Sequence, residues 1–335
     1  MKTTGLTLGK FAPFHKGHEF LLSSALAIVD NLICLIYDSP TITNIPLTVR
    51  ANWIRSIFPT VEVIELWDGP SEVGDTPEIK NMHETYILKL LNGRKITHFF
   101  CGEFYGEHMS IALNAQNCLI DPRRVNVPIS GSEIRENPFQ HREHLSPTVY
   151  KDYITNVVFL GAPSTGKSTL AAELAKTFNT VFMPEYGREY WESHQVNRRL
   201  SLEQLLEIAE GHLEREDQLL LKANKFLFTD TNALTTNMFS KYYHGRSHPN
   251  LSKYADNCFF RYDITFLCDS DIPYDDSWDR SGDANRQVFQ KQIEADLICR
   301  KIPYILLSGT LSERMAKVES TLSRFVKFNS MGSFL

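Results

Sequence analysis

The sequence predicts a two-domain α/β protein in which each domain is a parallel sheet flanked by helices. Its 335 residues are about the length of two average domains. Two stretches, one at the N-terminus and one near the middle of the chain, show the same order of patterns: a short apolar run, a loop with glycines, and a helical periodicity. A strand, a loop and a helix in this order begin a parallel sheet, so two such stretches predict two sheets.

Composition, charge and cysteine usage narrow the class of protein. The chain is 42% hydrophobic and 22% charged, as globular chains usually are. No apolar run approaches a membrane span and the N-terminus has no signal-peptide core, so we expect no membrane partner. A net charge of −5 without a basic block argues against a nucleic-acid partner, because phosphate neutralisation needs clustered Lys and Arg. The six cysteines are scattered without a C-x-x-C pair, so we expect reduced thiols in a cytoplasmic protein.

The first of the two stretches opens the chain. Residues 4–8 are typical of a strand and residues 19–29 of an amphipathic helix, and the loop between them contains H-x-G-H. The imidazoles of His15 and His18 can donate hydrogen bonds to phosphate oxygens beside a helix N-terminus. A surface position is the commoner fate of any one histidine, but the pattern G-x-F-x-P-x-H-x-G-H between a strand and a helix favours a nucleotide site.

Other residues of this loop fit the same site. Gly9 and Gly17 let a nucleotide approach the backbone closely, since neither carries a Cβ atom. Lys10 adds a positive charge near the same phosphates. We therefore predict nucleotide contacts from Gly9, Phe11 and Gly17.

The rest of the first half continues the α/β pattern. Further strands are expected at residues 32–37, 61–66 and 96–101, and a helix begins near residue 48. Residues 67–80 form a loop rich in Gly, Pro and acidic residues after the third of the four strands expected in this half. In an open α/β sheet such a loop is where a second substrate binds.

The segment ISGSEIR, residues 129–135, has two interpretations. Ser130 or Ser132 would cap a helix and offer a hydroxyl to phosphate, and Arg135 would point back to the same anion from one turn further on. The alternative is an ordinary capping box with a surface arginine. The H-x-G-H upstream favours the phosphate site.

The second stretch carries the more specific motif. Residues 161–169, GAPSTGKST, fit G-x-x-x-x-G-K-[ST], the P-loop, between a buried strand at 155–160 and a helix at 167–176. Its backbone N–H groups would wrap the phosphates of ATP, Lys167 would reach the β- and γ-phosphates, and Ser168 would hold Mg²⁺. The predicted nucleotide contacts are Gly161, Ala162, Pro163, Ser164, Thr165, Gly166, Lys167, Ser168 and Thr169.

Two polar segments follow later strands. After a strand at 181–183, residues 184–190 combine acidic, aromatic and basic side chains and are candidates for binding the phosphate acceptor. After a strand at 225–229, Asp230 would coordinate Mg²⁺ directly or through water, with a helix cap as the alternative. The long helix between them, capped by Ser201, is expected to be structural.

The remaining elements complete the second domain. A strand at 263–268 precedes a polar loop whose Arg280 and Arg286 would close over the phosphates as a lid, since arginine stabilises transferring charge. A last strand at 302–307 and a helix at 311–325 follow. We place the domains at residues 1–146 and 155–328, with a linker at 147–154.

In these motifs the chain resembles known families. The pattern of residues 9–18, ISGSEIR, and an R-x-x-W pair at Arg50 and Trp53 resemble the nucleotidyltransferase superfamily. EYGRE at residues 185–189 and TDTN at 229–232, together with the P-loop, resemble ribosylnicotinamide kinases. The order of the two resembles the bifunctional NadR-like family. The resemblance implies an N-terminal Rossmann-like nucleotidyltransferase domain and a C-terminal P-loop kinase domain.

The same resemblance implies the reactions. The kinase would phosphorylate nicotinamide riboside with ATP and Mg²⁺, and the adenylyltransferase would join the resulting nicotinamide mononucleotide to AMP, giving NAD and pyrophosphate. The catalytic residues implied are His15, His18, Lys10, Arg135, Lys167, Glu185 and Asp230. Either Glu185 or Asp230 would act as the kinase base. The acceptor contacts implied are Trp67 or Tyr86 in the first domain, and Glu185, Tyr186, Arg188, Thr231 and Asn232 in the second.

Two rival functions remain open at this level. One is a different nucleotidyltransferase–kinase pair with another acceptor, against which EYGRE and TDTN argue. The other is a nucleotide-sensing regulator without turnover, against which the intact histidines and P-loop argue. Because the first strand starts near residue 4, we expect no N-terminal helix-turn-helix of the kind that repressors in the family carry. The sequence is compatible with a homo-oligomer.

Overall fold

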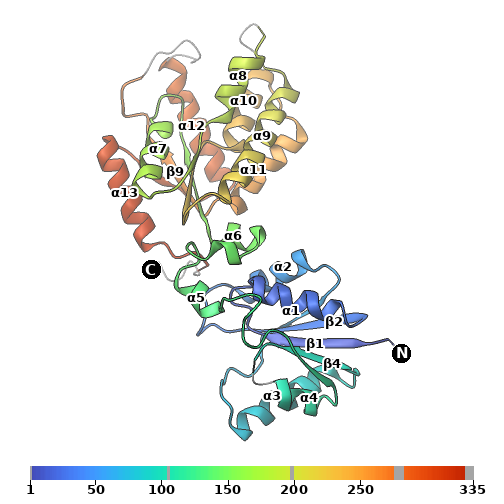
Figure 1. Cartoon of the computed structure of the whole chain (residues 1–335). Coiled ribbons are helices and arrows are strands. Elements are labelled where there is room, and N and C mark those ends of the chain that lie inside the picture. Colours follow the sequence, from blue (N-terminus) through green and yellow to red (C-terminus); the bar gives the residue numbers. More distant parts are fainter. Residues whose placement is uncertain (1, 104–105, 197–199, 275–282, 329–335) are drawn as a thin grey trace. The chain divides into compact units, whose positions relative to one another are not determined.

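The computed structural model describes residues 2–103, 106–196, 200–274 and 283–328, and the chain divides into two compact units (Figure 1). The first unit runs to Tyr150 and the second from Lys151 to Lys327. Helix α6 (Pro147–Tyr153) occupies most of the segment that we expected as a linker, and the division falls inside it.

The first unit contains a five-stranded parallel sheet in the order β3-β2-β1-β4-β5. The four predicted strands are confirmed, with shifts of one or two residues at their ends. β5 lies at the edge and is exposed at three of its four positions, so it lacks the apolar run by which the others were recognised. The strands are β1 (Thr4–Gly9), β2 (Asn31–Tyr37), β3 (Glu62–Leu66), β4 (His98–Cys101) and β5 (Gln116–Leu119).

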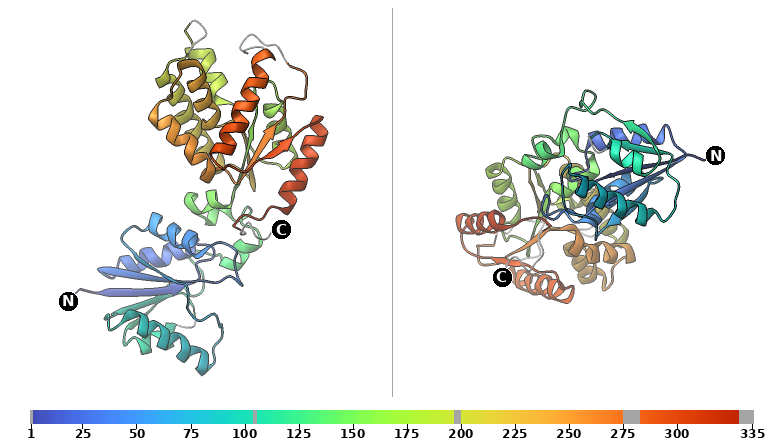
Figure 2. Two further views of the ribbon diagram at one scale, coloured as in Figure 1. Left: turned by 180° about the vertical axis from the view of Figure 1, so that it is seen from behind. Right: turned by 90° about the horizontal axis from the view of Figure 1, so that it is seen from below.

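Helices cover both faces of this sheet, with α1 and α2 on one and α3 and α4 on the other (Figures 1 and 2). β2 is buried at six of its seven positions because both of its faces are covered. Leu6, Ile33 and Leu35 pack with Ile87 of α3 and Met109 of α4. The helices are α1 (Lys16–Leu26), α2 (Leu47–Ile57), α3 (Pro77–Leu91), α4 (Gly106–Ala112) and α5 (Gly131–Glu136), followed by a short 3₁₀ turn, η1 (Arg142–His144).

The second unit contains another five-stranded parallel sheet, in the order β10-β9-β6-β8-β7. All five strands were predicted, although β10 begins three residues later than expected. They are β6 (Thr155–Leu160), β7 (Phe182–Met183), β8 (Phe226–Asp230), β9 (Ile264–Cys268) and β10 (Ile305–Leu307).

Alternation along β6 assigns the helices of this unit to two faces. Val157 and Phe159 belong to the cluster that includes α7 and α13, whereas Val158 and Leu160 belong to the cluster that includes α9, α10, α11 and α12. The predicted helices after the P-loop, after Ser201 and at the C-terminal end are confirmed. The helices are α7 (Lys167–Thr177), α8 (Tyr186–His194), α9 (Leu202–Leu220), α10 (Ala233–His244), α11 (Pro249–Arg261), α12 (Asp283–Cys299) and α13 (Leu311–Arg324).

The two sheets place their first strands alike. β1 pairs with both β2 and β4, and β6 pairs with both β8 and β9, so each first strand lies at the point where the strand order reverses. Ligands of open α/β sheets bind outside the carboxyl ends of the strands at this switch point. The two motif-bearing loops, 9–18 and 161–169, therefore leave their sheets at the expected ligand sites.

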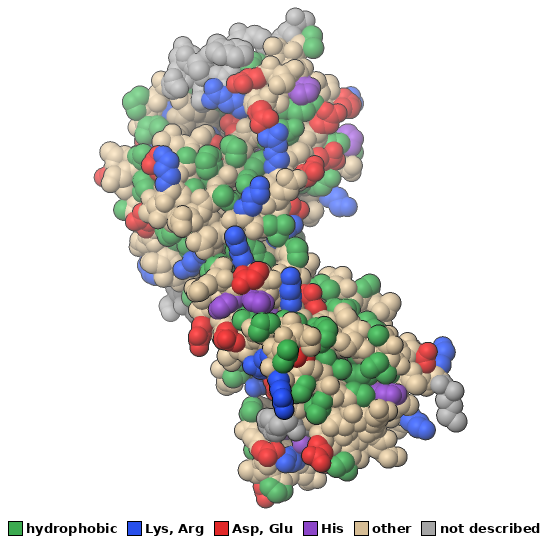
Figure 3. All heavy atoms as spheres, in the orientation of Figure 1, with side chains coloured by type: hydrophobic (Ala, Val, Ile, Leu, Met, Phe, Trp, Pro, Cys, Tyr) green, Lys and Arg blue, Asp and Glu red, His purple; other side chains and the backbone are tan. Residues whose placement is uncertain are grey.

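The surface agrees with the balanced composition. On the face shown in Figure 3, the acidic and basic side chains of the described residues are interspersed over both units. Every helix in the described part of the chain is too short or too polar to cross a lipid bilayer.

Candidate functional site

The H-x-G-H segment forms a reciprocal cap on α1. His15 is the N-cap residue, and its Nδ1 accepts a hydrogen bond from the Gly17 N–H at 3.1 Å. His18 Nδ1 accepts from the His15 N–H at 3.3 Å. A neutral imidazole whose Nδ1 accepts carries its proton on Nε2, so both rings have Nε2–H donors. The cap also explains why α1 begins three residues earlier than the apolar pattern predicts.

The two rings lie together in a buried place that keeps them neutral. Their centroids are 3.8 Å apart. Burial, with smaller contributions led by Arg124, lowers the pKa of His15 to about 4. Burial and the adjacent His15 hold the pKa of His18 well below its usual range. At neutral pH both side chains are therefore uncharged, and the His18 ring also has a hydrogen bond to the Pro13 backbone.

ISGSEIR meets the histidine loop across more than a hundred residues of sequence. A Cβ atom on Gly131 would lie 3.8 Å from His15 Nε2. Arg135 donates to the Ala12 carbonyl and, at 2.8 Å, to Ser132 Oγ. The predicted proximity of Arg135, Ser132 and the histidines is therefore present in the fold.

Ser130 has the contacts of the alternative interpretation. It is the N-cap of α5, where its Oγ accepts from the Glu133 N–H at 3.2 Å and donates to Glu133 Oε2 at 2.6 Å. Both functions of its hydroxyl are used within the capping box. Phosphate contact from this segment would therefore come from Ser132 and Arg135 rather than from the Ser130 hydroxyl.

Lys10 and Phe11 complete the loop in different ways. Burial, followed by the charge of Arg135, lowers the pKa of Lys10. Phe11 is buried, with its ring edge-on to His18 at 4.9 Å between centroids. Its side chain thus supports the histidine, which differs from the direct nucleotide contact that we predicted.

The R-x-x-W pattern pointed to Arg50 without giving it a role. In the structure this side chain holds the backbone of the loop at residues 9–18. Its side chain is fully buried and donates to the carbonyls of Lys10, of Tyr37 and of Ile45, the last two at 3.0 Å. Asp38 lies 3.4 Å from it. A buried guanidinium can hold several backbone carbonyls at once because its five N–H groups form a rigid fork.

The predicted ring-stacking residues lie on the loop after β3 and on α3. Trp67 is 60% exposed, and the Tyr86 hydroxyl donates to Asp68 Oδ1 at 2.6 Å. Tyr86 and Asp68 line a shallow surface depression. Either ring is accessible to a ligand at this position.

The second unit has a cavity of about 980 Å³ at the P-loop. Its walls come from the P-loop and from residues of α8, α9 and α10. The predicted site residues that line it are Gly161, Pro163, Ser164, Thr165, Gly166, Lys167, Ser168, Thr169, Glu185, Arg188, Thr231 and Asn232. Gly161 and Asn232, which are 71 positions apart in sequence, are thus brought to one site, as the motif order predicts.

The P-loop needs its glycines. Gly161 has φ +145° and a Cβ atom there would lie 2.6 Å from the Cys268 carbonyl, while Gly166 has φ +77°. Only glycine adopts such angles readily. Lys167 is buried and its Nζ donates to the Ala162 carbonyl at 3.0 Å.

Ser168 and Asp230 come together as predicted for a metal site. The Ser168 hydroxyl donates to Asp230 Oδ2, and Asp230 is fully buried at the end of β8. A hydroxyl and a carboxylate beside a phosphate-binding loop are oxygen ligands of the kind that Mg²⁺ takes together with substrate phosphates. The structure assigns the cap alternative to the neighbouring Asn232, whose Oδ1 accepts from the Leu234 N–H at 3.0 Å.

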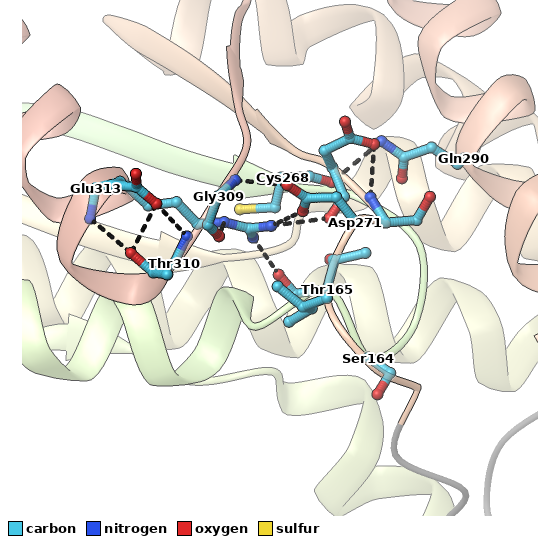
Figure 4. Close-up of polar contacts among 12 residues, drawn as sticks. Ser164, Thr165, Cys268, Asp271, Gln290, Gly309, Thr310 and Glu313 are labelled. Atoms are coloured by element: carbon cyan, nitrogen blue, oxygen red, sulfur yellow. Dashed lines mark hydrogen bonds and ion pairs between the residues drawn. The ribbon is translucent and has the colours of Figure 1, made fainter.

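Polar side chains from α12 and α13 hold the P-loop through hydrogen bonds to its backbone (Figure 4). Arg314 of α13 donates to the carbonyls of Thr165 at 2.7 Å, Gly309 at 3.0 Å and Asp269 at 3.2 Å, and pairs with Asp271. Gln290 of α12 accepts from the Ala162 N–H at 2.9 Å and donates to the Cys268 carbonyl at 3.1 Å. The Ala162 N–H, which we predicted to face phosphate, is therefore bound to Gln290.

The predicted lid arginines have different outcomes. Arg286 is buried and donates to the carbonyls of Ser164 and Ile272, each at 2.8 Å, so it lies beside the P-loop. Arg280 falls outside the described residues.

Of the predicted acceptor residues at the start of α8, two line the cavity and one packs against a neighbouring helix. Glu185 and Arg188 line the cavity, and Arg188 pairs with Glu192 at 3.4 Å. Tyr186 is not among the lining residues, contrary to our prediction. Its ring lies under the Arg215 guanidinium at 4.1 Å, in the space that Gly211 leaves by having no side chain.

The helix α9, which we predicted to be structural, also forms part of the cavity wall through Leu205, Ile208 and His212. The sequence signal that could have found this is the single histidine on an otherwise apolar stripe, spaced i, i+3 and i+7.

Comparison with known proteins finds a matching family for each half of the chain. Residues 6–137 match a family described as Cytidylyltransferase-like, and residues 156–314 match one described as AAA domain. The chain is 32% identical over 294 residues to the trifunctional NAD biosynthesis/regulator protein NadR of Escherichia coli (strain K12), covering 82% of this chain and 70% of that protein. The chain belongs to the NadR family.

Other NadR proteins are similar to the chain in sequence or in fold. The NadR protein of Salmonella typhimurium (strain LT2) is 31% identical over 299 residues, again covering 82% of this chain and 70% of its own length. Two crystal structures of NadR protein, one with NAD and AMP-PNP and one with NR, share the fold with TM-scores of 0.56 and 0.58. Each is 21% identical and covers 96% of this chain, and the match covers 96% and 95% of the respective NadR chains.

Proposed function

We propose that the chain converts nicotinamide riboside to NAD in two ATP-dependent steps. The second unit phosphorylates the riboside to nicotinamide mononucleotide, and the first unit transfers AMP to that product, releasing pyrophosphate. The observation that carries the proposal is the presence, in one NadR-family chain, of two different phosphate-binding loops at the switch points of two parallel sheets. The protein acts in the cytoplasm, where its free cysteines stay reduced.

In the kinase reaction the chain mainly positions and neutralises. Lys167 and the P-loop N–H groups hold the phosphates of ATP, and Ser168 with Asp230 would hold Mg²⁺, which would neutralise charge on those phosphates. The 5′-hydroxyl of the riboside attacks the γ-phosphorus, and ADP leaves. Glu185 orients this hydroxyl or takes its proton, because it lines the cavity while the Asp230 carboxylate is bound to Ser168.

In the adenylyl transfer the phosphate of the mononucleotide attacks the α-phosphorus of ATP. A P–O bond forms as the bond to pyrophosphate breaks, and no covalent enzyme intermediate is needed because the nucleophile is already an anion. His15 and His18 donate through Nε2, and Lys10, Ser132 and Arg135 add donors from the loop and from α5. Such preorganised donors stabilise the charge that develops on the five-coordinate phosphorus.

The test is a time course with nicotinamide riboside, ATP and Mg²⁺. We expect nicotinamide mononucleotide to appear first and NAD to follow with one pyrophosphate per NAD. A chain that binds these nucleotides without releasing ADP or pyrophosphate would instead be the sensor considered above. Transfer from CTP instead of ATP, or a preference for pantetheine phosphate over the mononucleotide as acceptor, would indicate a different enzyme pair.

A further inference from the structure

The cavity wall formed by α9 is apolar except at His212. Leu205, Ile208 and His212 are spaced i, i+3 and i+7 and so share one face of the helix. His212 is only 5% exposed. A polar side chain at this depth in a ligand-sized cavity is a candidate for recognising part of the ligand.

One nitrogen of the His212 imidazole, Nε2, makes no hydrogen bond with the described part of the protein. Nε2 is enclosed and has no hydrogen-bond partner among the described residues. The nearest carboxylate oxygen, Glu216 Oε2, is 4.0 Å away, which is too long for a hydrogen bond. Buried polar groups in folded proteins are nearly always hydrogen-bonded, so a histidine serving only the packing would have a partner.

Glu216, the nearest carboxylate, already makes three hydrogen bonds to other side chains. This carboxylate is fully buried and already accepts from Asn156 Nδ2 at 2.6 Å, Tyr262 OH at 3.0 Å and Arg261 Nε at 3.1 Å. Burial lowers the pKa of His212 despite the nearby Glu216, with Arg261 and Arg215 acting in the same direction as burial. The ring is therefore a neutral group with one donor and one acceptor nitrogen.

A second group of the same kind lies on the facing helix. Thr235 of α10 also lines the cavity, is 6% exposed, and has an enclosed hydroxyl oxygen without a partner among the described residues. α9 and α10 pack against each other. Two helices that line one cavity thus each carry a buried polar side chain with an atom that has no partner among the described residues, which points to a ligand with polar groups.

The position of the site selects the part of the ligand. The reacting hydroxyl of the acceptor must reach the P-loop and Asp230, whereas α8, α9 and α10 form the rest of the wall. Trp191, Phe239 and Tyr243 from these helices line the same cavity and suit a flat ring. With the ring beside these aromatic residues, His212 can contact a polar substituent on the ring.

We propose that His212 is a specificity residue of the kinase, hydrogen-bonding the carboxamide on the ring of the riboside acceptor. The proposal rests on the riboside kinase function proposed above. A neutral imidazole can make one hydrogen bond to a carboxamide, as donor or as acceptor according to its tautomer. Selectivity of this kind is strong because an acceptor without the group leaves the buried histidine unpaired.

The test compares the intact chain with His212→Leu and His212→Gln, using nicotinamide riboside and the ribosylpyridinium that lacks the carboxamide. For His212→Leu we expect the KM for nicotinamide riboside to rise on the order of tenfold, the size of one lost buried hydrogen bond. The KM for ATP should stay within about twofold and the preference over ribosylpyridinium should largely disappear. His212→Gln, which keeps a donor and an acceptor, should retain that preference.

Controls separate the possible failures. His194→Leu removes a histidine of α8 that is not among the cavity-lining residues and should leave both KM values unchanged. Adenylyl transfer by the first unit of the same chain reports intact protein, and His212→Ala replaces the leucine variant if the latter does not fold. An inactive wild-type kinase would refute the proposed function itself. An active wild type whose acceptor preference survives in His212→Leu or His212→Ala would refute this inference alone.

Discussion

The two loops that we propose to bind phosphate use different donors. In the first unit the proposed donors are side chains, the Nε2–H groups of His15 and His18, which form a reciprocal cap. In the second unit they are backbone N–H groups of a loop in which Gly161 and Gly166 have positive φ. The first arrangement needs buried neutral rings, and the second needs glycine at these two positions.

What the two loops share is the way in which they are held. In the first unit Arg50 donates to the carbonyl of Lys10 and Arg135 donates to that of Ala12. In the second unit Arg314 donates to the carbonyl of Thr165 and Arg286 donates to that of Ser164. An arginine that binds a loop carbonyl keeps a partial negative charge away from the phosphate. In both units arginine side chains thus hold the backbone of the proposed anion site, and Arg135 is also one of the proposed phosphate donors.

The strongest test of the separation between the loops is Lys167→Ala. It removes the cation of the P-loop, so riboside phosphorylation should fall on the order of a thousandfold. Adenylyl transfer to supplied nicotinamide mononucleotide should be unchanged, because the donors for that step lie in the other unit. Both rates are measured on one preparation, and loss of both together would contradict two independent sites.

The reverse experiment is His18→Ala. Loss of one preorganised donor should lower NAD synthesis from the mononucleotide about a hundredfold while leaving the kinase rate intact. His108→Ala, a histidine of the same unit paired with Glu84 at 2.8 Å, is the matched control and should keep normal NAD synthesis. Equal NAD synthesis in both variants would remove His18 from the site.

The shared support is tested by Arg314→Met. Without the guanidinium, the Thr165 carbonyl is released, and we expect kcat/KM for ATP in the kinase reaction to fall on the order of tenfold through misplacement of the loop. Arg324→Met, on the last turn of the same helix and exposed, should have no effect on this ratio. An Arg314 variant with normal kinetics and only a lower unfolding midpoint would reduce its role to stability.

The smallest expected effect is the pH dependence of the side-chain site. The folded pKa of His15, about 4, is below the value near 6.5 of an unfolded histidine, so its contribution to stability is present above pH 6.5 and is lost as pH falls toward 4. Between pH 7 and 6 this one group should cost the first unit about 0.7 kcal/mol. Urea unfolding at the two pH values measures it, and His15→Asn should flatten the dependence.

Local patterns were enough to find both loops and most of the sheets. The P-loop glycines, the H-x-G-H cap and the apolar β-branched strands are features of residues close in sequence, and a covered parallel strand needs little else to be recognised. β5 escaped because an exposed edge strand such as Gln116–Leu119 carries no apolar run. Tyr186 was misplaced because an aromatic residue at a strand end suits a ligand and a neighbouring helix equally well.

The sequence by itself determined the two loops at which we predict phosphate to bind, and only the tertiary structure decided which side chains hold each loop and which line the cavity beside the P-loop. Arg314 is 149 residues from Thr165, and Arg50 is 40 residues from Lys10. His212 reaches the cavity only because α9 packs beside α10. Backbone conformation is set by neighbouring residues and leaves a mark in the sequence. The partners of a buried side chain are set by the packing of distant elements, which no local pattern records.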